Sequence, residues 1–207
     1  ARERGGSDGL LYFIGDLLYA NKNNVGLKYG SKTYTNAQVK TALSTGVVFV
    51  PLSNPDGVAY DQSSNSCWRK NRNPASSTGS AASIGVDLNR NYDFNWSFGD
   101  TLWAPTESCN SGYNDDYDYY RGANPSSESE IQSIMNLAIE QQFLLSIAYH
   151  SSRSGCIDRY VIYPWAWKDK HGENQREYSP GFSVIEKLGM EIAEIAGMDI
   201  SQNYGHT

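Results

Sequence analysis

Short apolar runs alternate with segments of helical periodicity along this 207-residue chain. The apolar runs have the character of buried strands and span residues 47–52, 143–149 and 160–163. Apolar residues recur at helical spacing in segments that span residues 10–18, 131–139 and 182–195. This alternation predicts a single α/β domain in which helices flank a central mixed, largely parallel sheet.

Weaker local signals refine this pattern. A short helix is expected to begin at Thr35, and a further strand is expected over residues 83–88. The sequence Asn-Pro-Asp-Gly at residues 54–57 indicates a turn. Residues 61–82 are rich in Ser, Asn and Gly and predict a loop, whereas residues 93–125 show no clear period and predict irregular surface structure.

Charge and cysteine content narrow the class of protein. The net charge of -6 comes from scattered acidic residues, and the chain has no basic stripe, so nucleic acid is not an expected partner. The apolar run over residues 10–19 is interrupted by Asp16 and is too short to span a bilayer. Cys67, Cys109 and Cys156 allow at most one internal disulfide, and they lack the spacing of a cysteine zinc site.

Four polar residues near the ends of these elements form a candidate catalytic site, namely Glu3, Asn89, Arg90 and His150. Sites in α/β domains form at the carboxyl ends of strands, and His150 directly follows an apolar run. A catalytic zinc takes three protein ligands and keeps one position open for water, and Glu3 and His150 are ligands of the required type. The alternatives are a hydrogen-bonded structural role for His150 and a solvated surface position for Glu3.

The order of these motifs resembles the carboxypeptidase A/B-like zinc carboxypeptidases. Residues 1–3, Ala-Arg-Glu, are similar to the last three residues of the family's His-X-X-Glu zinc motif. Further motifs occur in the family's order and with similar intervals at residues 54–57, 68–72 and 85–92. The resemblance covers essentially the whole chain. It implies the family's fold, Zn2+ as cofactor, and Glu3 and His150 as metal ligands, with a further histidine ligand immediately before Ala1.

The resemblance also implies roles in substrate binding. Arg69 matches the arginine that polarises the scissile carbonyl and stabilises the oxyanion. Asn89 and Arg90 match the pair that holds the substrate's C-terminal carboxylate, a task that suits a planar guanidinium because it donates two parallel hydrogen bonds. Arg2 matches a residue that contacts upstream substrate residues, with a solvated position as its alternative. Ser151 matches the serine after the histidine ligand and is counted with the substrate-binding residues.

Arg69 and Arg90 also have structural alternatives. For Arg90 the alternative is a buried ion pair with Asp87 or Asp93, and for Arg69 it is a surface position packed on Trp68. An Asn-Arg-Asn sequence directly after a strand is a costly choice for packing alone, because buried cations need compensation. This cost favours the substrate-binding roles.

Together, the motifs imply a zinc-dependent carboxypeptidase that hydrolyses the C-terminal peptide bond of peptides or proteins through metal-activated water. Residues 1–207 are expected to form most of one catalytic domain, without the start of the zinc motif and without the C-terminal strands, one of which carries the general-base glutamate. This segment alone is therefore expected to be inactive. The alternatives are an inactive carboxypeptidase-like binding or assembly module and a zinc amidase, and the Asn-Arg pair disfavours the amidase. The abundance of Ser, Asn and Tyr with few Lys indicates a secreted protein or one of a secretory or lysosomal compartment.

Overall fold

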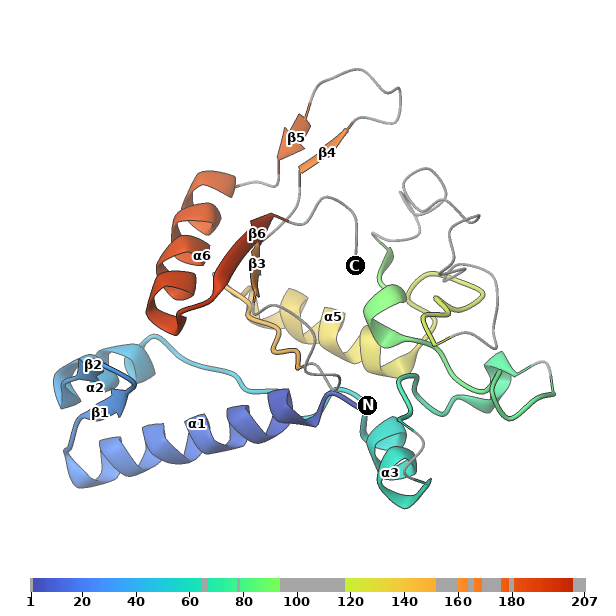
Figure 1. The fold of residues 1–207 in the computed structure, drawn as a ribbon, viewed down its shortest axis with the longest axis horizontal. Coiled ribbons are helices and arrows are strands. Elements are labelled where there is room, and N and C mark those ends of the chain that lie inside the picture. Colours follow the sequence, from blue (N-terminus) through green and yellow to red (C-terminus); the bar gives the residue numbers. More distant parts are fainter. Residues whose placement is uncertain are drawn as a thin grey trace.

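The computed structural model describes residues 2–64, 67–77, 79–93, 118–151, 160–163, 166–168, 176–178 and 181–202. The helices are α1 (Arg4–Asn23), α2 (Asn36–Ser44), α3 (Pro55–Ser64), α5 (Ser129–Gln141) and α6 (Phe182–Ala196), with the short 3-10 helices η1 (Pro74–Ser76) and η2 (Leu88–Arg90). The strands are β1 (Leu27–Tyr29), β2 (Lys32–Tyr34), β3 (Tyr160–Tyr163), β4 (Ala166–Lys168), β5 (Arg176–Tyr178) and β6 (Asp199–Gln202). Figure 1 shows α6 beside β3 and β6, and it shows α2 with the β1–β2 hairpin at the far end of α1.

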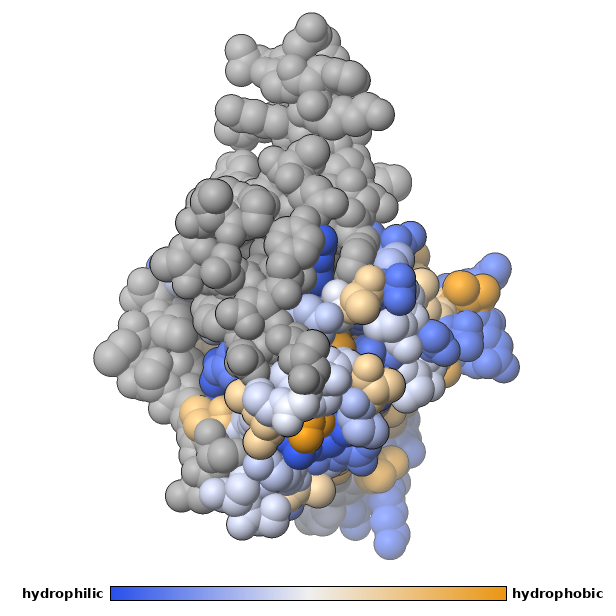
Figure 2. All heavy atoms as spheres, turned by 90° about the vertical axis from the view of Figure 1, so that its right-hand side faces the viewer, coloured by the Kyte–Doolittle hydropathy of each residue, from blue (hydrophilic) through white to orange (hydrophobic). Residues whose placement is uncertain are grey.

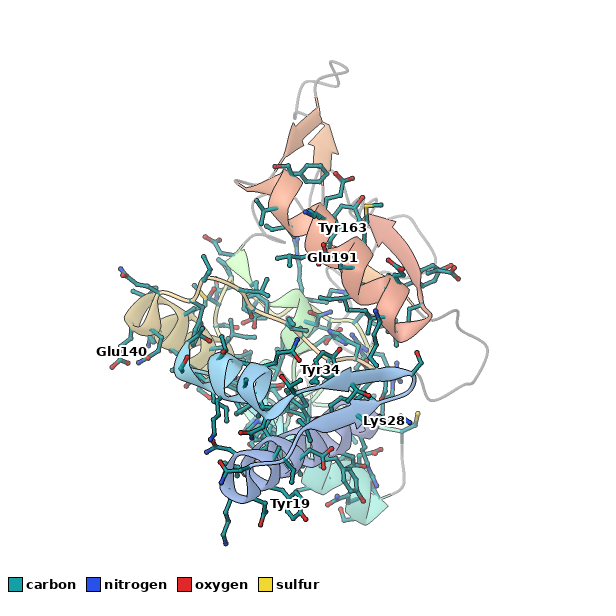
Figure 3. All side chains as sticks on the ribbon, turned by 90° about the vertical axis from the view of Figure 1, so that its left-hand side faces the viewer. Tyr19, Lys28, Tyr34, Glu140, Tyr163 and Glu191 are labelled. Atoms are coloured by element: carbon teal, nitrogen blue, oxygen red, sulfur yellow. The ribbon has the colours of Figure 1, made fainter. Side chains whose placement is uncertain are left out.

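The described strands form three separate two-stranded sheets, and the parallel pair of β3 and β6 is the one that has the character of an α/β domain. Tyr160 lies opposite Asp199, and α6 precedes β6 in the chain and packs on both strands. Parallel strands need such a crossover because a tight turn cannot join them. The Tyr163 ring lies 5.9 Å from the Phe182 ring, and its hydroxyl donates to Glu186 Oε1 at 3.4 Å, which ties β3 to α6 (Figure 3). The β1–β2 and β4–β5 pairs are antiparallel. The predicted α/β class is confirmed.

The predicted helices are confirmed, and local hydrogen bonds explain where they begin and end. Thr35 caps α2 through a capping box, because its side chain accepts a hydrogen bond from the Gln38 N–H while its own N–H donates to Gln38 Oε1. Asn24 ends α1 in the left-handed conformation, with φ 54. The buried core between these two helices consists of Leu17, Ala20 and Val39.

The apolar runs over residues 47–52 and 143–149 are not strands in the described part of the chain, so these two strand predictions are wrong. Several of their side chains are exposed, and Leu144 is fully so. A strand is stabilised by hydrogen bonds to a neighbouring strand and by coverage of its faces. Within the described ranges neither run has such a neighbour. Apolar character predicts burial, but a pairing partner depends on the tertiary structure.

The strand predicted over residues 83–88 is also wrong. Gly85 has φ +89, outside the conformation of a strand, and Asp87 caps η2, so the chain turns here. The Asn-Pro-Asp-Gly sequence opens α3, because Asn54 Oδ1 accepts a hydrogen bond from the Gly57 N–H at 3.0 Å. In both places a short polar side chain starts a helical turn.

Some sequence-based predictions concern parts of the chain at or beyond the described ranges. The predicted loop over residues 61–82 begins inside α3, and most of residues 93–125 lie outside the described ranges.

Among the helices of the described residues, none combines the length and the apolar character needed to cross a membrane. Hydrophilic residues predominate among the described residues on the face seen in Figure 2.

Replacing Gly85 with alanine is expected to destabilise the protein. Gly85 has φ +89, and a Cβ atom here would overlap the carbonyl of Asn71. Left-handed strain and this overlap together should lower the free energy of unfolding by about 3 kcal/mol, measured by urea denaturation. Gly79 is the matched control, because it has φ +117 but no atom within 4 Å of the position that a Cβ would take, and its alanine variant should lose only about 1 kcal/mol. Equal losses in the two variants would contradict the role of the close approach.

Candidate active site

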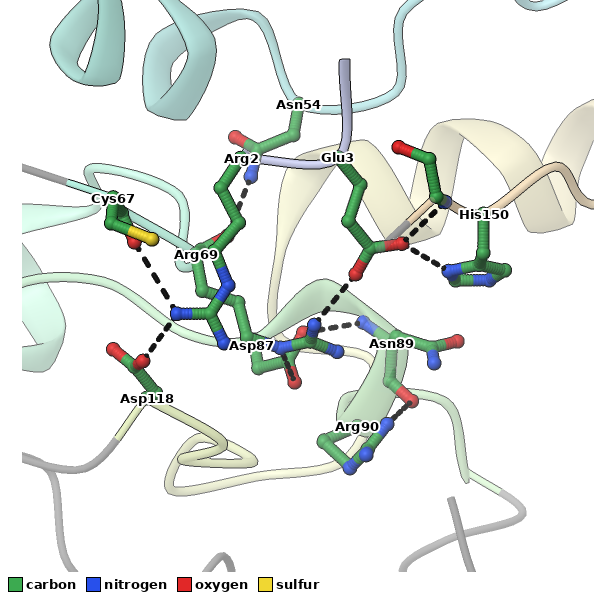
Figure 4. Close-up of polar contacts among 11 residues, drawn as sticks. Arg2, Glu3, Asn54, Cys67, Arg69, Asp87, Asn89, Arg90, Asp118 and His150 are labelled. Carbon is green, nitrogen blue, oxygen red and sulfur yellow. Dashed lines mark hydrogen bonds and ion pairs between the residues drawn. The ribbon is translucent and has the colours of Figure 1, made fainter. Parts of the chain in front are cut away.

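Glu3 and His150 are 147 residues apart in the sequence and meet in space. Glu3 lies directly before α1, and its Oε2 is 2.8 Å from Nδ1 of His150 (Figure 4). The same oxygen accepts a hydrogen bond from the Ser151 backbone N–H at 3.2 Å, while Arg69 binds the other oxygen. The Glu3 side chain is 25% exposed. The alternative of a solvated surface carboxylate is therefore wrong.

These two side chains fit a shared zinc ion. Zinc bonds to histidine nitrogen and carboxylate oxygen measure about 2.0–2.2 Å, so two tetrahedral ligand atoms lie about 3.3 Å apart. The separation of 2.8 Å between Glu3 and His150 needs only a small widening. Within the described ranges, no group of three His, Cys, Asp or Glu side chains could hold a metal. Glu3 and His150 have the chemical types of two zinc ligands, and a third would be needed.

The charge state of Glu3 also suits a metal ligand. Burial by itself raises the pKa of Glu3, but the hydrogen bond and charge of His150, together with the charge of Arg69, lower it to about 2. Glu3 is therefore a carboxylate at neutral pH. Carboxylate ligands bind metal in this deprotonated form.

Arg69 connects Glu3 to the second part of the site. Its Nη1 donates to Glu3 Oε1 at 2.8 Å, and its Nε donates to Asp87 Oδ2 at 2.7 Å. Burial lowers the pKa of Arg69, but the charges of Asp87 and Glu3 raise it above its ordinary value. The side chain is 11% exposed, so the alternative of a surface cation packed on Trp68 is wrong. A guanidinium fixed in this way can stabilise negative charge that develops beside Glu3.

The short helix η2 carries Asn89 and Arg90. Asp87 is its N-cap, because Asp87 Oδ1 accepts a hydrogen bond from the Asn89 N–H at 3.2 Å. Arg90 is 5% exposed, and its Nη1 donates to the Asn89 carbonyl at 3.3 Å. Burial lowers the pKa of Arg90; the charge of Asp87 opposes this shift and that of Arg69 adds to it. Such a buried cation favours a nearby anion.

The alternative for Arg90, a buried ion pair with Asp87 or Asp93, is supported only in part. Asp87 stabilises the charge of Arg90, yet its two oxygens accept hydrogen bonds from Arg69 and Asn89. Asp93 is exposed. Asp87 therefore interacts with Arg69, Asn89 and Arg90 at once. These residues, with Glu3 and His150, form the charged cluster of the site.

Arg2 lies in the same cluster and is held by two partners. Its Nη1 donates to Asp118 Oδ2 at 2.6 Å and to the Cys67 carbonyl at 3.3 Å, and its side chain is 19% exposed. The alternative of a solvated arginine is therefore wrong. Cys67 is a free thiol among the described residues, whereas Cys109 and Cys156 lie outside them.

Buried polar side chains hold the loops that carry Arg69 and Arg90. Asn71 Nδ2 donates to Glu128 Oε2 at 2.7 Å, and the Glu128 N–H donates to Asn91 Oδ1 at 3.1 Å. Asn71, Asn91 and Glu128 are all nearly inaccessible to solvent. If either segment moved away, a buried polar group would lose its hydrogen-bond partner, which costs free energy. The network therefore restricts the positions of the segments that carry Arg69 and Arg90.

The sequence indicated no role for Asp118 or Tyr119, and it indicated Asp87 only as an alternative ion-pair partner of Arg90. Asp87 had a local signal, since an aspartate directly before a helical turn is a preferred N-cap. The ring centroid of Tyr119 lies 4.6 Å from Arg69 Cζ and 5.2 Å from Arg90 Cζ. This contact joins distant parts of the sequence, so no local pattern indicated it.

Comparison with known protein families gives a match that agrees with this fold and with these side chains. The family model described as zinc carboxypeptidase matches residues 1–205. The chain belongs to the zinc carboxypeptidase family, as the resemblance of its motifs implied.

Individual relatives cover most of the chain but a smaller part of their own length. Carboxypeptidase A2 of Rattus norvegicus is 36% identical over 177 residues, which are 84% of this chain and 36% of that protein. Mast cell carboxypeptidase A of Homo sapiens is 26% identical over 166 residues, which are 78% of this chain and 34% of that protein. Metallocarboxypeptidase A of Trichophyton rubrum is 33% identical over 121 residues, 56% of this chain and 26% of that protein. The chain thus spans about a third or less of these relatives.

A solved structure supports the assignment of the fold. The crystal structure of thrombin activatable fibrinolysis inhibitor superposes with a TM-score of 0.60 and 20% sequence identity. The match covers 98% of this chain and 46% of that chain. At this identity the likeness concerns the fold alone.

Proposed function

We propose that the protein is a zinc-dependent carboxypeptidase that hydrolyses the C-terminal peptide bond of peptides or proteins. The observation that carries this proposal is the single charged cluster in which Glu3 and His150 converge and Arg69 links them, through Asp87, to the turn that bears Arg90. Membership of the family supports the reaction class. The charged cluster supports the way in which a substrate is held.

Each residue has a distinct task in this proposal. Glu3 and His150 would hold the zinc ion, which when bound would polarise the scissile carbonyl and activate water. Arg69 stabilises negative charge on the carbonyl oxygen, because its guanidinium is already fixed by two acids and needs no reorganisation. Asn89 and Arg90 hold the substrate's terminal carboxylate.

Arg2 and Ser151 complete the proposed substrate-binding set. Ser151 binds substrate next to Glu3, to which its backbone N–H donates, and Arg2, held by Asp118, contacts upstream residues of the substrate. We further propose that residues 1–207 form most of one catalytic domain. A histidine ligand and a general-base glutamate would come from elsewhere in the protein. A secreted location, or one in a secretory or lysosomal compartment, is part of the same proposal.

The full protein should release single residues from the C-terminus of a peptide and should be far slower on the same peptide with a C-terminal amide. We expect a difference of about 10²-fold or more in kcat/KM, because the amide leaves the buried Arg90 without its anionic partner. Mass spectrometry of timed digests measures both rates. A chelator should abolish the release, and added zinc should restore it.

Other outcomes would identify other functions. Cleavage at internal bonds, or equal rates on the acid and the amide, would contradict a carboxypeptidase. Binding of the free acid without zinc binding or hydrolysis would favour the inactive binding module. Zinc-dependent hydrolysis of non-peptide amides that ignores a terminal carboxylate would favour a zinc amidase.

A further inference from the structure

Two largely buried guanidinium groups influence each other in this site. The Arg69 side chain is 11% exposed, and Arg90 is 5% exposed. The charge of Arg69 lowers the pKa of Arg90, as expected for neighbouring like charges. Glu3 and Asp87 balance the charge of Arg69 through direct ion pairs. Arg90 has to remain a cation in the same surroundings if it is to bind a carboxylate.

The ring of Tyr119 lies against both cations. Its centroid is 4.6 Å from Arg69 Cζ and 5.2 Å from Arg90 Cζ, and both distances are within the range of about 6 Å for a cation–π interaction. The negative face of an aromatic ring attracts a cation without accepting its N–H donors in the plane of the guanidinium.

Hydrogen bonds fix the segment that carries this ring next to η2. The Asp87 N–H donates to the Tyr120 carbonyl at 2.8 Å. Asn91 Nδ2 donates to the Arg121 carbonyl at 2.9 Å. The segment around Tyr119 is thus attached to the residues on both sides of η2. These hydrogen bonds hold the backbone that carries the Tyr119 ring beside the turn that carries Arg90.

We propose that Tyr119 is a positioning residue for substrate recognition, whose ring, within cation–π distance of both guanidinium groups, holds Arg69 and Arg90 as neighbouring cations at the place where Arg90 binds the substrate's terminal carboxylate. This role rests on the proposed carboxypeptidase function. It requires the aromatic face of Tyr119 and not its hydroxyl.

The test measures the preference of the full zinc-bound protein for a carboxylate over an amide. The probes are 3-phenylpropanoic acid and its primary amide, with 6-aminohexanoic acid and its primary amide as a second pair, because they contain no acylated C-terminal residue that the protein could release. Isothermal titration calorimetry gives the ratio of the two Kd values. Tyr119→Leu and Tyr119→Met should each reduce the acid preference about tenfold, whereas Tyr119→Phe should keep it within about twofold.

A matched control separates this role from general stabilisation. Tyr60 makes a similar contact with Arg72, at 3.8 Å from Cζ to the ring centroid. Tyr60→Leu should lower Tm and leave the acid preference unchanged. The methionine variant at position 119 retains most of the side-chain volume, so it tests the proposal even if the leucine variant folds poorly.

The possible failures are distinguishable. Wild-type acid preference that persists in both aliphatic variants would overturn the role of Tyr119 and leave the proposed function intact. A loss in Tyr119→Phe as large as that in Tyr119→Leu would overturn the argument from the ring face. No acid preference in the wild-type protein would overturn both this inference and the carboxylate binding by Arg90.

Discussion

Arg90→Ala is expected to lower kcat/KM for a peptide with a free C-terminus by about 10²–10³-fold. Removal of one partner from a buried, hydrogen-bonded charge pair costs about 2–5 kcal/mol, and each 1.4 kcal/mol is a factor of ten. The free energy of unfolding should change by less than about 1 kcal/mol, because burial and the charge of Arg69 already disfavour this cation in the unliganded protein. Steady-state kinetics and urea denaturation of the full protein measure the two effects.

Two controls show whether the loss of kcat/KM in Arg90→Ala depends on the terminal carboxylate of the substrate. The same peptide as a C-terminal amide should be cleaved slowly by wild type and variant alike. Arg72→Ala removes an arginine that stacks on Tyr60 and Trp68, so it should lower stability and leave the ratio of acid to amide rates unchanged. An unchanged kcat/KM on the free acid in Arg90→Ala would end the assignment of Arg90 to the substrate carboxylate.

His150→Ala is expected to reduce the zinc affinity of the full protein by more than 10²-fold and to abolish hydrolysis. Changes to groups that only orient a metal ligand already cost about 10–100-fold in affinity, and removal of a ligand costs more. Glu3→Gln should act in the same direction, because it removes the anionic charge that the low pKa of Glu3 maintains. Competition with a chromogenic chelator measures the affinity.

Folding should not explain this loss. The His150 side chain is 54% exposed, so its removal should change the free energy of unfolding by less than about 1 kcal/mol. Glu186→Gln is the control for a change of charge, since Glu186 lies on α6 and contacts Tyr163. It should bind zinc like the wild type. Zinc affinity of the wild-type level in His150→Ala would show that His150 is not a metal ligand.

Sequence motifs identified the members of the charged cluster better than they identified the surroundings of that cluster. Residue type and motif order selected Glu3, Arg69 and Arg90, and the structure brings the three into one region (Figure 4). The sequence indicated no role for their partner Tyr119, and it indicated Asp87 only as an alternative ion-pair partner of Arg90. A partner is defined by a contact between distant segments, and such a contact has no local period or spacing.

Local patterns predicted the main helices and several of their ends, and the motifs indicated the family that the comparisons confirmed. Such predictions succeed because helical periodicity and caps such as Thr35 depend on residues a few positions apart. No local pattern indicated that the apolar runs over residues 47–52 and 143–149 have no strand partner among the described residues. Nor did one indicate that the oxygens of Glu3 lie between His150 and Arg69. Pairing and charge compensation depend on which distant segments pack together, and packing of the whole chain sets those distances.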